Sequence, residues 1–314
     1  MEYSEIIDIF EKHDRFLILT HKSPDGDTLG SGFALCYFLR DMGKQANVVN
    51  SDGFPDRYDF MYVDYTEQDF EPEYIIAVDV ADPTLLGSGL LKYQQEGAVD
   101  LCIDHHVSNK HFAKLTHVEG GIAAAAQILY CIFKHSGRKI TDIIAKCLYT
   151  GIATDTGCFK YENTTPSTHI AAAELMAYDI DFANVNRRMF DVKSKGRIKI
   201  EQIVTGRMEY YLNDRCAMIA ITRELMQSCG VAEAEFDGLA SIPLSAEGVV
   251  LGITIKQRHT NVYKISVRTT DEMDASVFCG YFGGGGHIRA AGCEIHGTLE
   301  EVKAQLLERA GQVL

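Results

Sequence analysis

The chain has 314 residues, of which 46% are hydrophobic and 24% are charged, and its formal net charge is -14 at pH 7. This length predicts two domains, each with its own core, and the ordinary composition excludes a fibrous or wholly disordered chain. The negative charge argues against broad, sequence-blind binding to duplex nucleic acid, which needs a basic face. It is compatible with a small anionic substrate held by metal ions and a few cationic side chains.

Neither the start of the chain nor its cysteines indicate a secreted or membrane protein. Residues 1–15 are amphipathic and acidic, unlike a signal peptide, and no later segment is apolar over the length that crosses a bilayer. The nine cysteines include no C-x-x-C pair and lie mostly in apolar runs, which is typical of reduced thiols in a cytosolic core. We therefore expect a cytoplasmic protein without a membrane segment.

Predicted strands and helices alternate through the first half of the chain. After a first helix that Ser4 can cap, buried strands are predicted at 15–20, 46–50, 74–80 and 98–104. Helices are predicted at 27–39, 121–137 and 141–153, the first of them ended by Gly43. This alternation indicates a parallel sheet with helices on both faces, in which ligands gather at the carboxyl ends of the strands.

The second half predicts a smaller α/β domain. Helices are expected at 166–180 and 181–194, followed by a longer helix over 193–210 that links the two domains. Strands are expected at 216–222, 248–257 and 262–270, with helices that begin at Thr222 and at the capping box of Thr298. The predicted fold is thus α/β, with a parallel-sheet catalytic domain over 1–192, a linker helix over 193–210 and a substrate-binding domain over 211–314.

Acidic and histidine side chains follow the ends of several predicted elements in the first domain. These residues are His21, Asp25, Asp27, Asp79, Asp104, His105, His106 and Asp155. Each by itself has an ordinary explanation as a helix cap, a loop acid or a surface histidine. Their coincidence at one sheet edge favours a metal site, and carboxylates with imidazoles and no thiolate suit Mn²⁺, Mg²⁺ or a similar ion.

The number of carboxylates indicates more than one ion. Asp25, Asp27, Asp79 and Asp155 would bring four negative charges into one cleft, where some would be protonated unless cations offset them. Two divalent cations would neutralise this charge. A two-metal site stabilises the oxygens of an in-line phosphoryl displacement, so the sequence predicts metal-assisted phosphoester hydrolysis.

Five segments carry a family resemblance. "HKSPDGDTLGS", "VDVAD", "DHHVSN" and "GIATDTG" resemble, in this order, the four motifs of the DHH phosphoesterases, and "GGGGHIRAAG" resembles the signature of the DHH-associated domain. The resemblance covers the whole chain. It implies one ion held by His21, Asp25 and Asp79. It implies a second ion held by Asp27, Asp79, His105 and Asp155, with Asp79 bridging the two. The expected metal is Mn²⁺, with Mg²⁺ or Co²⁺ as alternatives.

The resemblance also implies two catalytic residues beside the metals. Asp104 would orient a ligating histidine, as residues behind metal ligands commonly do. His106 would face the substrate phosphate or the attacking water. The segment "CFKYENTTPSTH" resembles another family segment, but Thr165 and Pro166 at a helix start explain much of it structurally, and we assign it no catalytic role.

The second domain is expected to bind substrate. The glycine run with Gly284, Gly285 and Gly286 would let backbone N–H groups approach a phosphate, and His287 follows directly. Arg268 occupies the place of the arginine in the family's S-x-R strand, where a planar guanidinium can clamp a phosphate. Arg258 and Arg289 are weaker candidates, for which a solvated surface charge is an equal explanation.

Family members of this length without added modules degrade short oligoribonucleotides and dephosphorylate pAp. We therefore expect a manganese-dependent phosphoesterase that acts on short single-stranded RNA, on pAp, or on both. The alternative is a phosphodiesterase of c-di-AMP or its linear product, which the sequence does not separate from the first hypothesis. The hypothesis of a non-catalytic nucleotide-binding protein predicts that at least one metal-ligating residue is replaced. None of the expected ligands is missing from this sequence. Family members often pair through the first domain, so a homodimer is left open.

Overall fold

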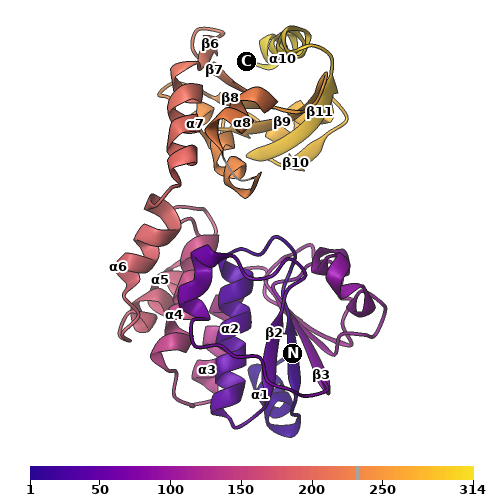
Figure 1. Cartoon of the computed structure of the whole chain (residues 1–314), viewed down its shortest axis with the longest axis vertical. Coiled ribbons are helices and arrows are strands. Elements are labelled where there is room, and N and C mark those ends of the chain that lie inside the picture. Colours follow the sequence, from indigo (N-terminus) through magenta and orange to yellow (C-terminus); the bar gives the residue numbers. More distant parts are fainter. Residues whose placement is uncertain (231–232) are drawn as a thin grey trace. The chain divides into compact units, whose positions relative to one another are not determined.

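A computed structural model describes residues 1–230 and 233–314, and it divides the chain into two units, Met1–Val192 and Lys193–Leu314 (Figure 1). Each unit has its own sheet and its own hydrophobic core. The boundary between the units is the start of the predicted linker helix. We describe each unit by itself.

The first unit contains a five-stranded sheet in the order β2-β1-β3-β4-β5, and its strand pairs are all parallel. The strands are β1 (Phe16–Leu19), β2 (Ala46–Val49), β3 (Tyr74–Val78), β4 (Leu101–Asp104) and β5 (Leu115–Val118). This confirms the predicted parallel sheet. The sequence did not predict β5, because this edge strand is only partly buried and has no continuous apolar run.

Helices cover both faces of this sheet, as predicted. The α-helices are α1 (Tyr3–Lys12), α2 (Gly26–Asp41), α3 (Ala125–His135), α4 (Asp142–Asp155), α5 (Pro166–Leu175) and α6 (Phe182–Asn186). A core that includes Phe16 and Ile18 of β1 packs under α1 to α4, whereas Leu17 and Leu19 face the opposite side. There the cover consists of the short 3-10 helices η2 (Pro83–Leu86) and η3 (Ser88–Tyr93).

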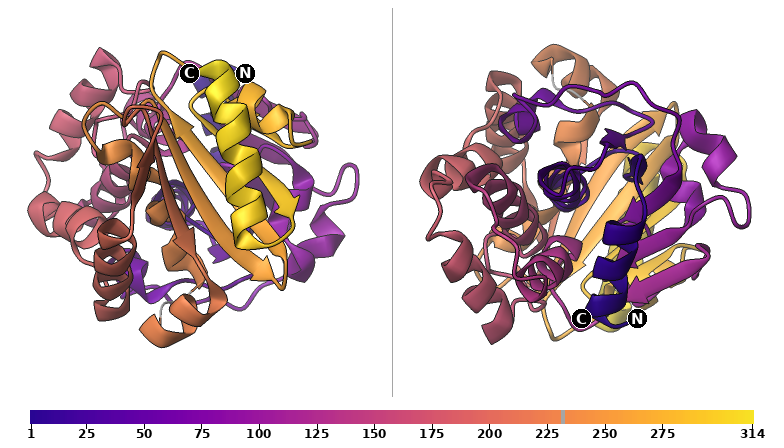
Figure 2. Two further views of the ribbon diagram at one scale, coloured as in Figure 1. Left: turned by 90° about the horizontal axis from the view of Figure 1, so that it is seen from above. Right: turned by 90° about the horizontal axis from the view of Figure 1, so that it is seen from below.

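The second unit contains a six-stranded mixed sheet in the order β10-β11-β9-β8-β7-β6, in which only β7 and β8 pair in parallel among the described strands. The strands are β6 (Glu209–Tyr211), β7 (Cys216–Ile221), β8 (Leu251–His259), β9 (Val262–Thr269), β10 (Gly285–His287) and β11 (Ala290–His296). The helix α10 (Leu299–Val313) lies across one face of the sheet (Figure 2), together with α9 (Ala275–Gly280). The other face is covered by α7 (Lys195–Gly206), α8 (Arg223–Cys229) and the 3-10 helix η5 (Glu233–Ser241).

The helix expected over 193–210 is shorter than predicted. α7 ends at Gly206, and Glu209–Tyr211 forms β6, which pairs with β7. The apolar side chains of Ile200 and Val204 pack on the sheet of the second unit, so the tertiary contacts of α7 place it within that unit. Over the described ranges, no helix combines the length and the apolar character that a membrane crossing requires.

Candidate metal centre

The first cluster of ligands lies where β1 leads into α2. The side chain of Asp25 caps α2 by accepting hydrogen bonds from the N–H groups of Asp27 and Thr28 at 3.0 and 3.1 Å. Nδ1 of His21 lies 2.8 Å from the carbonyl oxygen of Lys22. Nδ1 therefore carries the proton, and Nε2 is left as a ligand. Nε2 of His21 faces Asp25 Oδ1 at 3.6 Å.

Asp27 is buried in the first turn of α2, on the side that faces α3. Its carboxylate accepts hydrogen bonds from the N–H groups of Ala125 and Ala126 at 2.7 and 2.9 Å and from Ser31 Oγ at 3.2 Å. The carboxylate therefore also complements the N-terminus of α3. The sequence allowed Asp27 to be a helix cap or a metal ligand. In the structure its carboxylate accepts hydrogen bonds at the N-terminus of α3 and also faces the other proposed ligands.

Glycines let α2, α3 and α4 approach one another around Asp27, and Figure 1 shows these helices side by side. A Cβ on Gly26 would lie 2.3 Å from Thr154 Oγ1, and a Cβ on Gly30 would lie 2.5 Å from the carbonyl of Cys147. A Cβ on Gly151 would lie 2.8 Å from Asp27 Oδ1. These positions require glycine because of close packing, and sequence reasoning missed this for Gly30 and Gly151.

Asp79 follows β3 and lies between the two histidines. It is 3% exposed, and its φ of 57° is unusual for a residue other than glycine. Its Oδ2 is 3.6 Å from Nε2 of His21, and its Oδ1 is 3.5 Å from Nε2 of His105. One carboxylate thus faces both imidazoles, each with a different oxygen.

The buried carboxylate of Asp104 ends β4 and organises both histidines that follow. It accepts a hydrogen bond from the backbone N–H of His105 at 2.9 Å and from Asn109 Nδ2 at 2.6 Å. Its contact with an imidazole is with Nδ1 of His106, at 2.7 Å. The ring that Asp104 orients is therefore that of His106, whereas the sequence-based expectation was a ligating histidine. Nδ1 of His105 instead contacts the carbonyl of Ile122 at 3.3 Å.

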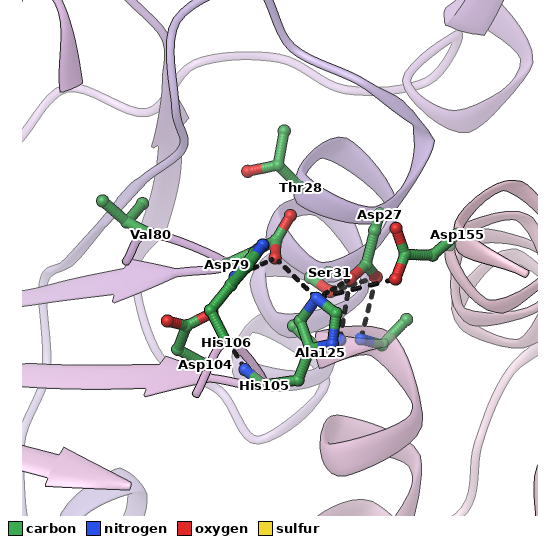
Figure 3. Close-up of polar contacts among 12 residues, drawn as sticks. Asp27, Thr28, Ser31, Asp79, Val80, Asp104, His105, His106, Ala125 and Asp155 are labelled. Carbon is green, nitrogen blue, oxygen red and sulfur yellow. Dashed lines mark hydrogen bonds and ion pairs between the residues drawn. The ribbon is translucent and has the colours of Figure 1, made fainter. Parts of the chain in front are cut away.

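The structure brings the predicted site residues together in three overlapping groups that could hold an ion. These groups are His21, Asp25 and Asp79; Asp27, His105 and Asp155; and Asp79, Asp104, His105 and His106. Within each group the ligand atoms lie within 4.8 Å of one another. Asp155 is the last residue of α4, and its Oδ2 lies 3.6 Å from Nε2 of His105 (Figure 3). Asp25 and Asp27 thus fall in different groups, as the sequence had suggested.

Two buried atoms in this cluster lack hydrogen-bond partners, namely Asp79 Oδ1 and His105 Nε2. Burying a polar atom without a partner is unfavourable, so the vacant bonding capacity of these two atoms calls for a ligand. Their separation of 3.5 Å is too long for a good hydrogen bond but suits two ligands of one ion. These residues therefore fit divalent metal ions.

The protonation of the cluster reflects its charge. Burial lowers the pKa of His21, but the carboxylates of Asp25 and Asp79 outweigh it and raise this pKa to about 11. His105 behaves alike, with a pKa raised to about 10 by its acidic neighbours. Burial raises the pKa of Asp155 to about 6 and also raises that of Asp27. Protons thus take the place of cations when metal is absent.

In the second unit, the predicted glycine loop is an extended strand. Gly285, Gly286 and His287 form β10 at the edge of the sheet, paired with β11. A Cβ on Gly284 would lie 2.2 Å from the carbonyl of Gly292, and Gly286 has a φ of 148°. Strand packing therefore accounts for two of these glycines. The exposed edge leaves backbone groups of β10 open to a ligand.

Arg268 and His287 point to the same face of this sheet. The register pairs His287 with Ala290 and Ala290 with Arg268, and directly paired residues project to one side. Arg268 lines a cavity of about 130 Å³ whose other polar residues are Thr254, Lys256, Lys264 and Ser266. Arg289 instead donates to the carbonyls of Thr270 and Met273 and so has a structural role.

Comparisons with known proteins agree with this geometry. The family model described as "DHH family, N-terminal domain" matches residues 15–152. The bifunctional oligoribonuclease and PAP phosphatase NrnA of Thermus thermophilus is 31% identical over 305 residues, which cover 95% of this chain and 89% of that protein. The chain belongs to the DHH family. Members of this family are metal-dependent phosphoesterases, and this DHH protein is accordingly a hydrolase.

Two further relatives bear on the fold and on the alternative function. The crystal structure of an exopolyphosphatase-related protein from Bacteroides fragilis is similar to this DHH protein with a TM-score of 0.85 and 27% identity, over 98% of this chain and 94% of that chain. A more distant relative, the cyclic-di-AMP phosphodiesterase GdpP of Geobacillus thermodenitrificans, is 24% identical. The match covers 96% of this chain but only 48% of that protein.

Proposed function

We propose that this DHH protein is a two-metal phosphoesterase that hydrolyses short oligoribonucleotides and pAp with the help of Mn²⁺. The observation that carries the proposal is the placement of Asp79, whose two carboxylate oxygens face His21 and His105 at 3.6 and 3.5 Å. A carboxylate that faces two ligand groups suits two neighbouring ions. The naming of the Thermus relative as an oligoribonuclease and PAP phosphatase supports the substrate class.

The proposed ligands divide between the two ions. His21, Asp25 and Asp79 would hold one ion. The second ion would be held by Asp27, Asp79, His105 and Asp155. Two bound divalent ions would acidify a water molecule at neutral pH and offset the negative charge of the phosphoester during displacement. The mixture of hard carboxylate oxygens with imidazoles favours Mn²⁺, and also accommodates Mg²⁺ or Co²⁺.

We assign proton transfer at this site to His106. Its Nδ1–H donates to the buried Asp104, so Nε2 is free to accept or donate a proton. The hydrogen bond to Asp104 raises the pKa of His106, which favours the protonated ring. Protonation of the leaving oxygen of a phosphoester is the chemistry for which such a ring is suited.

In the second unit, we assign substrate binding to Arg268, the glycines 284–286 and His287. The guanidinium of Arg268 lines a cavity with two lysines and two hydroxyl groups, which is a cationic and donor-rich surface. In the strand register, Ala290 lies between Arg268 and His287, so a small side chain separates the two candidate phosphate-binding residues.

The decisive experiment is a turnover panel in Mn²⁺. The substrates are pAp, dinucleotides, a five-nucleotide RNA, c-di-AMP and pyrophosphate, and the products are separated by chromatography. We expect mononucleotides from the RNA substrates and AMP from pAp. Absence of turnover on every nucleotide substrate by protein that has bound two Mn²⁺ ions would refute the proposal. Preferred cleavage of c-di-AMP would instead support the alternative, which the GdpP relative favours only weakly.

A further inference from the structure

A short backbone segment, residues 122–126, holds two ligands of the second group. We call it the α3 entry segment. The carbonyl of Ile122 contacts Nδ1 of His105 at 3.3 Å, which directs Nε2 of that ring into the cluster. The N–H groups of Ala125 and Ala126 donate to the two oxygens of Asp27. These ligands, which lie 78 residues apart in sequence, are thus fixed to the same segment.

Asp155 is tied to the α3 entry segment in a different way. Its carbonyl is at the C-terminal end of α4, where helix carbonyls have no partner within the helix. This carbonyl accepts a hydrogen bond from Asn163 Nδ2 at 3.1 Å, and the same Nδ2 donates to the carbonyl of Ala123, also at 3.1 Å. One side-chain amide therefore joins the third ligand to the segment that holds the other two.

The loop that brings Asn163 back to Asp155 begins with a tight turn. Residues 157–159 have φ values between 55° and 62°, so the chain reverses in a left-handed turn directly after α4. The ring of Tyr161 packs on Gly157, where a Cβ would lie 2.4 Å from Tyr161 Cζ. The turn brings the Asn163 amide between the two carbonyls, while Tyr161 stays 62% exposed.

We propose that Asn163 is a positioning residue for the ion held by Asp27, His105 and Asp155, an inference that rests on the proposed two-metal function. The amide of Asn163 carries two N–H donors and can serve two carbonyls at once. An aspartate of the same shape would present only acceptors to these carbonyls when ionised. The proposal gives a positioning role to Asn163 in the segment "CFKYENTTPSTH", which resembles a family segment and to which the sequence analysis assigned no catalytic role.

The test measures Mn²⁺ binding to metal-free full-length protein by calorimetry and by electron paramagnetic resonance. The variants are Asn163→Ala and Asn163→Asp, with Glu162→Gln, an exposed neighbour, as the control. We expect the unaltered protein and the control to bind two ions. In both Asn163 variants, the affinity for one ion should fall about 10- to 100-fold while the other is retained, and excess Mn²⁺ should restore kcat.

Three results would overturn the proposal. The first is binding of both ions by the Asn163 variants with unaltered affinity. The second is a loss of affinity for both ions together with a large drop in the melting temperature of the metal-free protein. This result would indicate a general structural role. The third is failure of the unaltered protein to bind two ions, which would refute the two-metal function as well and so differs from the first two.

Discussion

The carboxylate of Asp104, which has no exposed surface, holds Nδ1 of His106 at 2.7 Å. This hydrogen bond fixes the tautomer of the neutral ring, so that Nε2 is the basic nitrogen of His106. A buried carboxylate behind an imidazole suits proton transfer and also occurs behind metal-ligating histidines. The proposed catalytic role of His106 therefore has to be separated from a ligand role by experiment.

Removing this imidazole should slow catalysis without removing the metals. We expect His106→Asn to lower kcat about 100-fold or more, which is the range of general acid–base catalysis. Asp104→Asn should lower kcat in the same direction, because the amide can no longer fix the tautomer. The measurement is kcat at saturating Mn²⁺ on a short RNA, together with the number of ions bound. His111→Gln, in an exposed loop nearby, is the control, and unchanged kcat in His106→Asn would contradict the assignment.

Asp79 should be more important for metal binding than the other carboxylates. We expect Asp79→Asn to lower the affinity for both ions. The decrease should exceed the roughly 10- to 100-fold that follows the loss of a residue supporting a ligand. The reason is that an amide lacks the charge that both ions share. Calorimetric titration with Mn²⁺ measures the two affinities. Asp82→Asn, which alters a partly buried carboxylate near Asp79 that pairs with Lys110, is the control. Loss of only one ion in Asp79→Asn would argue against a bridging role.

Metal binding should release protons. In the metal-free protein at pH 7, His21 and His105 are protonated because their pKa values are raised to about 11 and about 10. An ion needs the Nε2 lone pair of each ring, so both protons must leave. Calorimetry in buffers of different ionisation enthalpy should detect at least about two protons released, because the raised pKa of Asp27 adds to the release from the two histidines. The affinity should rise with pH. Binding that is independent of buffer and of pH would contradict this.

The same shifts predict how the metal-free protein responds to pH. A histidine whose pKa is raised on folding contributes stability that is complete below its ordinary pKa of 6.5 and is lost as the pH rises through the folded value. The raised pKa of Asp155, about 6, acts in the same direction at lower pH. The melting temperature after metal removal should therefore fall between pH 6.5 and 10, whereas metal-loaded protein should show a smaller change.

A methyl group on Gly151 should disturb both stability and metal binding. The added Cβ would lie 2.6 Å from Ala126 Cβ and 2.8 Å from Asp27 Oδ1. We expect Gly151→Ala to lower the free energy of unfolding by about 1–3 kcal/mol, as overpacking does. The affinity for the ion beside Asp27 should fall as well. Gly206→Ala is the control, because Gly206 is also helical and its Cβ would meet nothing within 4 Å. Equal stability of the two variants would argue against close packing of these helices.

Loss of the Arg268 guanidinium should affect substrate affinity only. We expect Arg268→Ala to raise KM about 10- to 100-fold, the effect of losing hydrogen bonds to a charged group, with two ions still bound. Arg207→Ala, an exposed arginine of the same unit, is the control. Steady-state kinetics on pAp and a short RNA measure the effect, and an unchanged KM on both substrates would remove Arg268 from the binding surface.

Much of the site could be predicted because its ligands occur directly after apolar strands. The runs before His21, Asp79 and His105 read as buried parallel strands, and the carboxyl ends of such strands meet at one edge. The shorter elements were missed for the opposite reason. β5 and β6 have few buried apolar side chains, and their pairing partners rather than their own sequences make them strands.

The sequence by itself determined the order of the motifs, the charge excess of the cluster and the ligand types, because all three depend on residue identity and local pattern. The family resemblance also implied which ligands share an ion. Only the tertiary structure decided the contacts behind these ligands: Asp104 binds the ring of His106, and Asn163 lies between the carbonyls of Ala123 and Asp155. The contact of Asn163 with Ala123 joins residues 40 apart in the chain, and its geometry depends on how closely α3 and α4 pack, which no local pattern encodes. The contact of Asp104 with His106 is local, but the sequence does not show which of two adjacent histidines the carboxylate binds.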